Sequence, residues 1–377
     1  MASKAHAVAT VLTLLCHLVT AKHGVSILPN KLHNGPLTAE TVAGTGSLDG
    51  LKLSTTANIT SYEWWYFDVV STQSKNESIN VVFYNAGSVG FPGGYVDGPL
   101  SVGLSGTFEN GTLFAYDLPV SHKVVIVENE EGLTGDWQGT GAWFAGSSLS
   151  RPRIVYEVAV DSPEIGVCGK IKLRSVAPPR FSCSPNVPGA NELAFLNVGW
   201  SNAVPDADAT VDFDVDGSRL RFQGLGYHDK NWGLTPFAND VKHTYWGHAR
   251  VGPYSVVFSD GQIPVAGGPN TTELVSATVS KHGKFVELSC AEEAVVVRPW
   301  GGNDEYPPAA GSAPPLGLEL TFRLGREGTL RLNVTNDLVI SDEPFYQRFI
   351  GSVEGRVDDG DVLEGRALWE QFKLIGV

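Results

Sequence analysis

Residues 62–68 (YEWWYFD) place five aromatic and two acidic side chains within one short segment. In an extended strand, successive side chains point to opposite faces, which divides the segment into two sets: Trp64, Tyr66 and Asp68, against Glu63, Trp65 and Phe67. An aromatic face with a carboxyl group suits an apolar small molecule held by ring stacking and one or two hydrogen bonds. The alternative is that these aromatic side chains pack a hydrophobic core.

A second segment, residues 224–233 (GLGYHDKNWG), begins and ends with glycine and is the densest polar and aromatic string in the chain. His228 and Asp229 have side chains suited to general acid or base catalysis. Lys230 is suited to donating a hydrogen bond to a carbonyl group, and Asn231 to orienting a substrate. The alternative is a structural turn whose Asp and Asn side chains bond to nearby backbone.

The sequence lacks the common motifs of metal and cofactor chemistry. His228, His243 and His248 match no zinc spacing, and there is no Cys-x-x-Cys pair. There is also no Gly-x-Ser-x-Gly elbow, no Walker-type phosphate loop and no dinucleotide fingerprint that opens a helix. We therefore expect no metal and no cofactor, and we disfavour hydrolases, kinases and dehydrogenases.

The elements that must position these side chains are β-strands. Residues 63–70 and 79–84, separated by a polar turn, predict a hairpin. Similar strand signals recur at 123–127, 153–160, 170–176, 211–215, 220–225, 329–334 and 367–372. Breaks rich in Gly and Pro separate them at 90–98, 178–179, 185–189 and 299–315. Because no long amphipathic helix interrupts these strands, we predict an all-β protein.

The two halves of the chain echo each other. Residues 64–68 and 79–83 in the first half resemble residues 245–250 and 254–258 in the second half. Each half is thus predicted to open with the same hairpin. We predict an N-terminal β domain over residues 22–208 and a C-terminal β domain over residues 209–377, with a linker at 202–208.

Composition narrows the class of protein and of partner. The 377 residues include 43 Gly and 22 Pro but only 18% charged residues, which suits a turn-rich β protein and disfavours disorder or a coiled coil. Asp and Glu number 41 against 27 Lys and Arg, for a net charge of −14. We therefore expect no nucleic acid and no anionic membrane as partner. The oligomeric state is not indicated.

Residues 1–21 predict a secretory signal peptide. Lys4 precedes an apolar run over residues 7–19, shorter than the about 18 residues of a membrane span, and small residues follow it. We expect cleavage before Lys22 and a secreted glycoprotein; a retained membrane anchor is the alternative. Five Asn-x-Ser/Thr sequons agree with this route: Asn58, Asn76, Asn110, Asn270 and Asn333.

The cysteines allow one disulfide in the mature chain. Cleavage removes Cys16 and leaves Cys168, Cys183 and Cys290, an odd number. We favour a bond between Cys168 and Cys183, which would close a short loop, with Cys290 as a free thiol. Three thiols without a bond are the alternative.

The two segments described first, together with the tail 364–372 (EGRALWEQF), resemble the hydroxyneurosporene synthase (carotenoid hydratase) superfamily and its fungal Diels–Alderase branch. The resemblance spans most of the mature chain. It implies two lipocalin-like β domains with a ligand pocket at or near their junction. It also implies a cofactor-free pericyclase of fungal secondary metabolism, similar to the hetero-Diels–Alderases that join a tropolone quinone methide to a humulene-type sesquiterpene.

A hetero-Diels–Alder reaction requires two π systems to be held face to face, and such preorganisation supplies up to about 7–11 kcal/mol. Hydrogen-bond donors would activate the heterodiene carbonyl, and a carboxylic acid would assist any loss of water. The candidate catalytic residues are Glu63, Tyr66, Asp68, His228, Asp229 and Lys230. The candidate substrate-binding residues are Trp64, Trp65, Phe67, Asn231, Trp232, Tyr245, Trp246 and Trp369.

Other functions stay open beside this one. The expected substrate is an apolar polyene or a quinone methide, which an intramolecular Diels–Alderase acting on a polyketide would also fit. A terpenoid hydratase or dehydratase is a further alternative, although Lys230 stands where hydratase-type members of the superfamily carry a second His. A lipocalin-like carrier without catalysis is the third.

Overall fold

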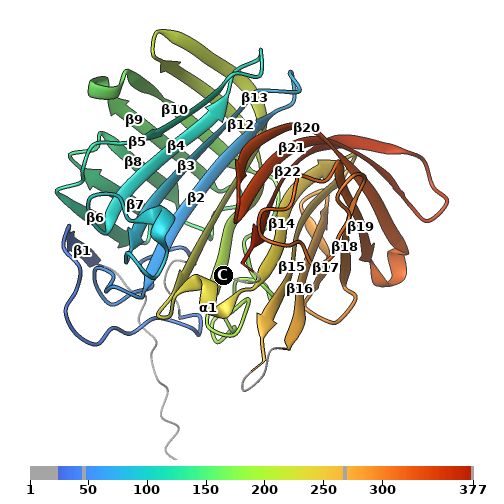
Figure 1. Ribbon diagram of the computed structural model, residues 1–377, viewed down its shortest axis with the longest axis horizontal. Coiled ribbons are helices and arrows are strands. Elements are labelled where there is room, and N and C mark those ends of the chain that lie inside the picture. The colour runs from blue at the N-terminus through green and yellow to red at the C-terminus, as the bar shows by residue number, and fades with distance from the viewer. Residues whose placement is uncertain (1–23, 45–47, 266–269, 375–377) are drawn as a thin grey trace, which may run out of the picture.

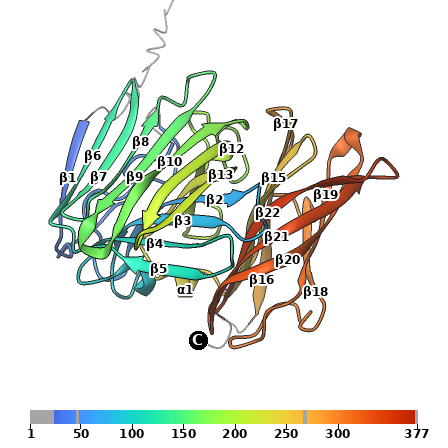
Figure 2. The same cartoon turned by 90° about the horizontal axis from the view of Figure 1, so that it is seen from above.

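The computed structural model describes residues 24–44, 48–265 and 270–374, and its regular structure is almost entirely β (Figure 1). Two antiparallel sheets, each curled on itself, lie side by side (Figure 2). The predicted all-β, lipocalin-like fold is therefore confirmed. The signal peptide predicted at residues 1–21 lies outside the described residues. Within the described ranges, no helix is long and apolar enough to cross a membrane.

The first sheet has 13 strands, in the spatial order β1-β6-β7-β8-β9-β10-β12-β13-β2-β3-β4-β5, with β11 paired to β12. Their bounds are β1 (Gly24–Pro29), β2 (Tyr62–Ser71), β3 (Ser78–Ala86), β4 (Leu100–Thr107), β5 (Leu113–Asp117), β6 (Lys123–Asn129), β7 (Gly132–Gln138), β8 (Ala142–Ser147), β9 (Val155–Ser162), β10 (Val167–Ser175), β11 (Arg180–Phe181), β12 (Gly199–Val215) and β13 (Ser218–Gly233). Two short 3₁₀ turns, η1 (Pro92–Gly94) and η2 (Pro163–Ile165), lie between its strands.

The second sheet has nine strands, in the order β17-β16-β15-β14-β22-β21-β20-β19-β18. Their bounds are β14 (His243–Val251), β15 (Tyr254–Pro264), β16 (Thr271–Lys281), β17 (Lys284–Ser289), β18 (Val295–Trp300), β19 (Gly317–Arg323), β20 (Thr329–Glu343), β21 (Tyr346–Val357) and β22 (Leu363–Lys373). A single helical turn, α1 (Phe237–Asp240), precedes this sheet, and the 3₁₀ turn η3 (Gly325–Glu327) follows β19.

The sequence echo corresponds to a repeated arrangement of strands. In the first sheet β13 is followed by β2, β3, β4 and β5, and in the second β22 is followed by β14, β15, β16 and β17. The hairpins β2–β3 and β14–β15 therefore take equivalent places in the two sheets. In both, the last long strand of the unit pairs with the first strand of the hairpin.

Burial along the strands shows where the cores lie. In β6, Val124 and Ile126 are buried and their neighbours are more exposed, as expected for a strand with one face on a core and one in water. Strand β2 is instead buried along its whole length. Its Trp65 packs in the core of the first sheet, whereas Trp64 belongs to a cluster between the two sheets. Thus one face of β2 contributes to the core of the first sheet, and the other face contributes to the cluster between the two sheets.

The boundary between the two units differs from the predicted one. Residues 202–208 are part of β12, which pairs with β10 and β13 inside the first sheet. The first sheet continues to Gly233 and the second begins at His243. Pro205 and its neighbours suggested a linker, but the pairing of β12 with β13 shifts register on both sides of Val204, and such irregularities accommodate a proline within a strand.

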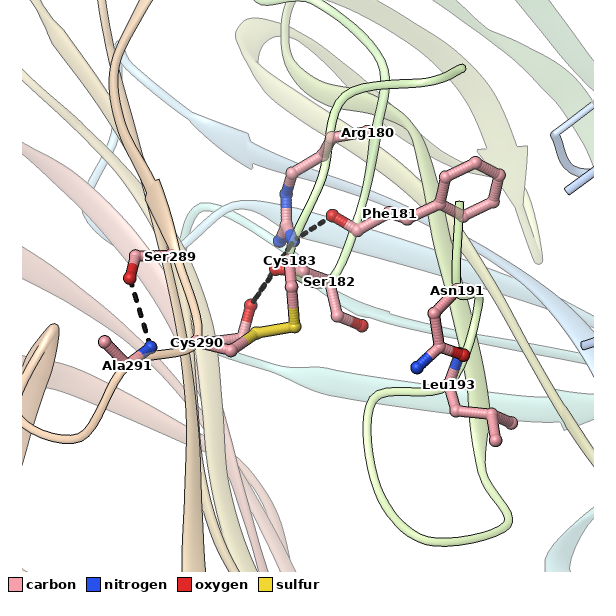
Figure 3. The surroundings of a disulfide bond; sticks show 10 residues. Arg180, Phe181, Ser182, Cys183, Asn191, Leu193, Ser289, Cys290 and Ala291 are labelled. Carbon is pink, nitrogen blue, oxygen red and sulfur yellow. Dashed lines mark hydrogen bonds between the residues drawn. A yellow bond between two sulfur atoms is a disulfide. The ribbon is translucent and has the colours of Figure 1, made fainter. Parts of the chain in front are cut away.

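The predicted disulfide is wrong. Cys183 bonds to Cys290, which links the turn after β11 to the segment after β17 and so joins the two sheets (Figure 3). Cys168 is an exposed free thiol on β10, where it lies between Asp161 and Asp214 of the neighbouring strands. Proximity in sequence misled the prediction, because the β11 turn lies against the second sheet.

Candidate active site

A cavity of about 570 Å³ lies between the two sheets. Strands β2, β3 and β13 supply one wall and β14, β21 and β22 the other, while α1 and the loop that carries η1 close one end. Most of the lining side chains are apolar, and many of them are aromatic: Trp64, Tyr66, Tyr84, Phe91, Phe195, Trp200, Phe237, Trp246, Phe345, Tyr346 and Phe372. A concave, largely apolar space with a few polar groups is typical of a small-molecule site.

Asp229 is the buried carboxyl group of β13 that lines this cavity. Its Oδ2 accepts hydrogen bonds from Trp200 Nε1 and from the Tyr227 hydroxyl, both at 2.8 Å. Its Oδ1 has no hydrogen-bond partner in the described part of the chain. Burial raises the pKa of Asp229 to about 7, although the bonds from Tyr227 and Trp200 lower it. Asp229 is therefore protonated in a large fraction of molecules at neutral pH and suited to act as a general acid.

A second polar group lies on the opposite wall. Glu370 Oε1 accepts hydrogen bonds from Arg348 Nε at 2.7 Å and from the Tyr66 hydroxyl at 3.0 Å. Arg348 Nη1 also donates to Asn80 Oδ1 at 2.9 Å, which fixes the guanidinium. Burial raises the pKa of Tyr66 well above its usual value, so its phenol stays neutral. This corner offers a fixed cation and hydrogen-bond donors to a polar group of a substrate.

Aromatic rings lie between these two polar groups. The Trp246 ring centre is 5.5 Å from that of Tyr66 and 5.0 Å from that of Tyr227. At the other end of the cavity, the Trp64 ring lies 4.4 Å from Phe91. Ring faces of this kind stack on flat substrates and stabilise positive charge.

Five of the residues singled out from the sequence line the cavity: Trp64, Tyr66, Asp229, Asn231 and Trp246. Successive side chains of a strand point to opposite faces, and in β2, β13 and β14 these residues occupy the positions that face the cavity.

The residues at intervening positions of β2 and β13 point away from the cavity, into the first sheet. The Lys230 ammonium group lies 2.6 Å from Glu63 Oε2 and 3.0 Å from the centre of the Trp65 ring. Burial lowers the pKa of Lys230 to about 8, although Glu63 raises it. The ring of His228 stacks on Phe67 with 3.9 Å between centres.

His228 is held at both ring nitrogens. Nδ1 bonds to the backbone oxygen of Tyr66 at 2.9 Å, and Nε2 to Asp49 Oδ2 at 3.0 Å. Trp232 likewise faces away from the cavity and donates from Nε1 to the backbone oxygen of Glu40 at 2.7 Å. These residues support the cavity wall from behind.

The other predicted residues lie deeper in the molecule. Asp68 is at the junction of the sheets, where both of its oxygens lie 3.0–3.1 Å from His248 Nε2. Tyr245 and Trp369 pack in the core of the second sheet.

The polar residues of the cavity that were not predicted include Trp200, Arg348 and Glu370. Glu370 could have been predicted from strand alternation along the tail segment 364–372, which places its side chain on the face opposite to that of the core residue Trp369. For Arg348 the sequence offered no such signal. In the described part of the chain, no cluster of three or more His, Cys, Asp or Glu side chains could hold a metal ion.

Comparison with known proteins places the chain in a family. Residues 25–295 match the Diels-Alderase-like family. A quinolone epoxide rearrangement protein of Penicillium thymicola is 42% identical over 93% of this chain and 95% of its own length. A second protein of that description, from Emericella nidulans, is 37% identical over 96% of each chain.

More distant relatives agree. A Diels-Alderase of Chaetomium globosum is 29% identical over 53% of this chain and 46% of its own. The crystal structure of CghA with Sch210972 shares the fold, with a TM-score of 0.76, 16% identity and coverage of 93% of this chain and 98% of that one. The predicted relationship to Diels–Alderases is confirmed at the level of the family, while the two relatives that match nearly the whole chain are named for epoxide rearrangement, not for tropolone chemistry or carotenoid hydration. The chain belongs to the Diels-Alderase-like family.

Proposed function

We propose that this protein is a cofactor-independent enzyme of fungal secondary metabolism that isomerises an epoxide on a flat, quinolone-type substrate. The observation that carries the proposal is Asp229, a buried acid with a pKa of about 7 and one oxygen free of protein partners, in an aromatic cavity. The names of the two relatives that match nearly the whole chain support the substrate class.

The reaction needs an acid and no redox partner. The protonated carboxyl group of Asp229 gives its proton to the epoxide oxygen, and one C–O bond breaks as positive charge develops on carbon. A neighbouring substituent then migrates with its electron pair to that carbon. The protonated carbonyl that results returns its proton to Asp229, so the product is an isomer of the substrate.

The cavity suits the charged intermediate. The rings of Tyr66 and Trp246 line the wall next to Glu370, and aromatic faces stabilise a cation by about 0.5–2 kcal/mol each. Few other groups could act as nucleophiles, because the lining is mainly apolar, so migration is favoured over addition of water. Arg348 and Asn231 would orient the polar edge of the quinolone.

The test is conversion of a synthetic quinolone epoxide to its isomer, followed by liquid chromatography with mass detection. Asp229→Asn should lower kcat/KM by about 10²–10⁴-fold, since general acid catalysis contributes that much. Its melting temperature should stay close to that of the wild type.

Asp260→Asn is the matched control. Asp260 is also fully buried with a pKa raised to about 7, but it accepts a hydrogen bond from Tyr306 at 2.8 Å within the second sheet, away from the cavity. It should leave the isomerisation rate near that of wild type. Equal losses in the two variants, or an active Asp229→Asn enzyme, would reject the proposal.

A pericyclase is the second candidate function, and the family description and the aromatic cavity favour it. In this case the rings hold two π systems face to face, and Tyr66 or Arg348 donates to a heterodiene carbonyl. The hetero-Diels–Alder reaction between a quinone methide and a terpene alkene is the form that the sequence suggested. One enriched stereoisomer of the cycloadduct, at a faster rate than without protein, would support this candidate over epoxide isomerisation.

We also propose passage through the secretory pathway. The Cys183–Cys290 disulfide supports this, because such bonds persist in oxidising compartments. The asparagines of three sequons, Asn110, Asn270 and Asn333, have exposed side chains, and those of Asn58 and Asn76 are half-buried. A mass decrease on treatment of the secreted protein with an N-glycosidase would support the proposal, and retention of an unglycosylated protein in the cytosol would contradict it.

A further inference from the structure

Arg180, in β11, is a fully buried cation near the contact between the two sheets (Figure 3). One face of its guanidinium group covers the Trp200 ring, with 4.4 Å from Cζ to the ring centre. Burial lowers the pKa of Arg180 to about 10, although Tyr227 and Asp229, which do not contact the guanidinium, raise it, so the side chain stays charged at neutral pH. Its Nη1 contacts the turn that follows, in which Cys183 is exposed.

Only one of its three nitrogens has hydrogen-bond partners in the protein. Nη1 donates to the backbone oxygens of Phe181 and Ser182, at 3.2 and 3.4 Å, and to Ser276 Oγ at 3.5 Å. Nε and Nη2 have no partner among the described residues, and no described carboxylate forms a salt bridge with Arg180. The N–H groups of Nε and Nη2 point to the same side of the guanidinium, so both can donate to one anion.

Three other buried cations of the molecule each form a salt bridge with a carboxylate. Lys52 pairs with Glu192 at 2.6 Å, Lys230 with Glu63 at 2.6 Å, and Arg348 with Glu370 at 2.7 Å. A buried charge without a counter-charge is strongly destabilising. Lys373 is also buried and forms no salt bridge among the described residues, but its ammonium group donates to the backbone oxygen of Ser312 at 2.8 Å. Arg180 differs from these cations because two of its nitrogens have no partner in the described chain, and an anion would provide one.

The surroundings of Arg180 are rich in unpaired donors. Three hydroxyl groups have no partner in the described chain: those of Ser182, Ser184 and Ser201. Ser182 and Ser184 belong to the turn that follows Arg180, and Ser201 lies opposite Phe181 in the pairing of β11 with β12. The unpaired acceptor of this neighbourhood is Asn202 Oδ1, opposite Arg180. Each hydroxyl can donate as well as accept, so these groups can supply further hydrogen bonds to a partner of Arg180, and the positive charge of the guanidinium favours an anion over water as that partner.

We propose that Arg180 binds a small inorganic anion of the halide class, which its Nε and Nη2 hold beneath the turn between β11 and Cys183. The full burial of the side chain excludes a large anion. Arg180 covers the Trp200 ring but is not among the residues that line the cavity, so the proposed anion site is separate from the substrate.

The test uses sodium bromide as the probe on the purified protein. Crystals soaked in bromide should show an anomalous peak within hydrogen-bond distance of Arg180 Nε and Nη2. In solution, bromide should raise the melting temperature by about 2 °C over sodium gluconate at equal ionic strength, because an ion that binds only the folded state stabilises it.

Variants separate the site from general salt effects. Arg180→Met should abolish the difference between the two salts, and Arg180→Lys, which keeps the charge but not the two-pronged edge, should reduce it. Arg250→Met is the control, since Arg250 already pairs with Asp206 at 2.7 Å, and it should keep the difference. Water at Arg180 with no bromide peak would overturn the proposal. So would a peak without any thermal effect, which would mean binding at crystal concentration only.

Discussion

Strands β2 and β13 carry polar side chains on both of their buried faces, one toward the core of the first sheet and one toward the cavity. On the core face, both oxygens of Glu63 and both ring nitrogens of His228 have protein partners. On the cavity face, Asp229 has protein partners at one oxygen only. The polar groups on the core face thus bond to the protein and stabilise the fold. The carboxyl group on the cavity face keeps one oxygen available to a substrate.

The largest expected effect on stability comes from removing the buried ion pair between Lys230 and Glu63 on the core face. Lys230→Met leaves the Glu63 carboxylate buried without its cation, which should lower the free energy of unfolding by about 3–5 kcal/mol in urea titrations. Lys172→Met is the control, since Lys172 and Glu157 form an exposed pair that contributes less than about 1 kcal/mol. Similar losses in the two variants would mean that the core-face pair does not support the wall.

The ionisation of Asp229, on the cavity face, should determine the pH dependence of catalysis. The raised pKa means that the protonated carboxyl group of Asp229 persists up to pH of about 7. Since that form is the acid, kcat/KM for epoxide isomerisation should be level below this pH and fall about tenfold per unit above it. A rate that rises through neutral pH would instead indicate a base at this position.

A smaller effect is expected from the second polar group of the cavity. Tyr66→Phe removes the hydrogen bond to Glu370 but keeps the ring, so kcat/KM should fall about threefold to tenfold, equivalent to about 0.5–1.5 kcal/mol. Tyr116→Phe is the control, because its hydroxyl bonds to Asp216 at the surface. An unchanged rate for Tyr66→Phe would mean that only the ring matters.

Strand alternation predicted part of this arrangement. It separated Trp64 and Tyr66 from Glu63 and Trp65, and the structure has them on opposite faces of β2. Applied to residues 226–233, which continue β13, the same rule separates Asp229 from its two neighbours, but the sequence signal for a strand ended at Leu225.

The remaining features depend on contacts between distant parts of the chain. Arg348 reaches the cavity only because β21 of the second sheet lies against β3 of the first, a placement that no local pattern encodes. The Cys183–Cys290 bond spans 107 residues for the same reason. The pKa of Asp229 is set mainly by burial, which is a property of the assembled fold.

The most direct test of the account is a titration of Asp229 itself, without substrate. Infrared difference spectra between wild type and Asp229→Asn would follow the carbonyl band of the protonated carboxyl group from acid to alkaline pH. The account predicts that this band disappears with a midpoint of about pH 7. A midpoint near 3.8, the ordinary value for an aspartate, would contradict it, because the cavity would then hold a carboxylate and no acid at neutral pH.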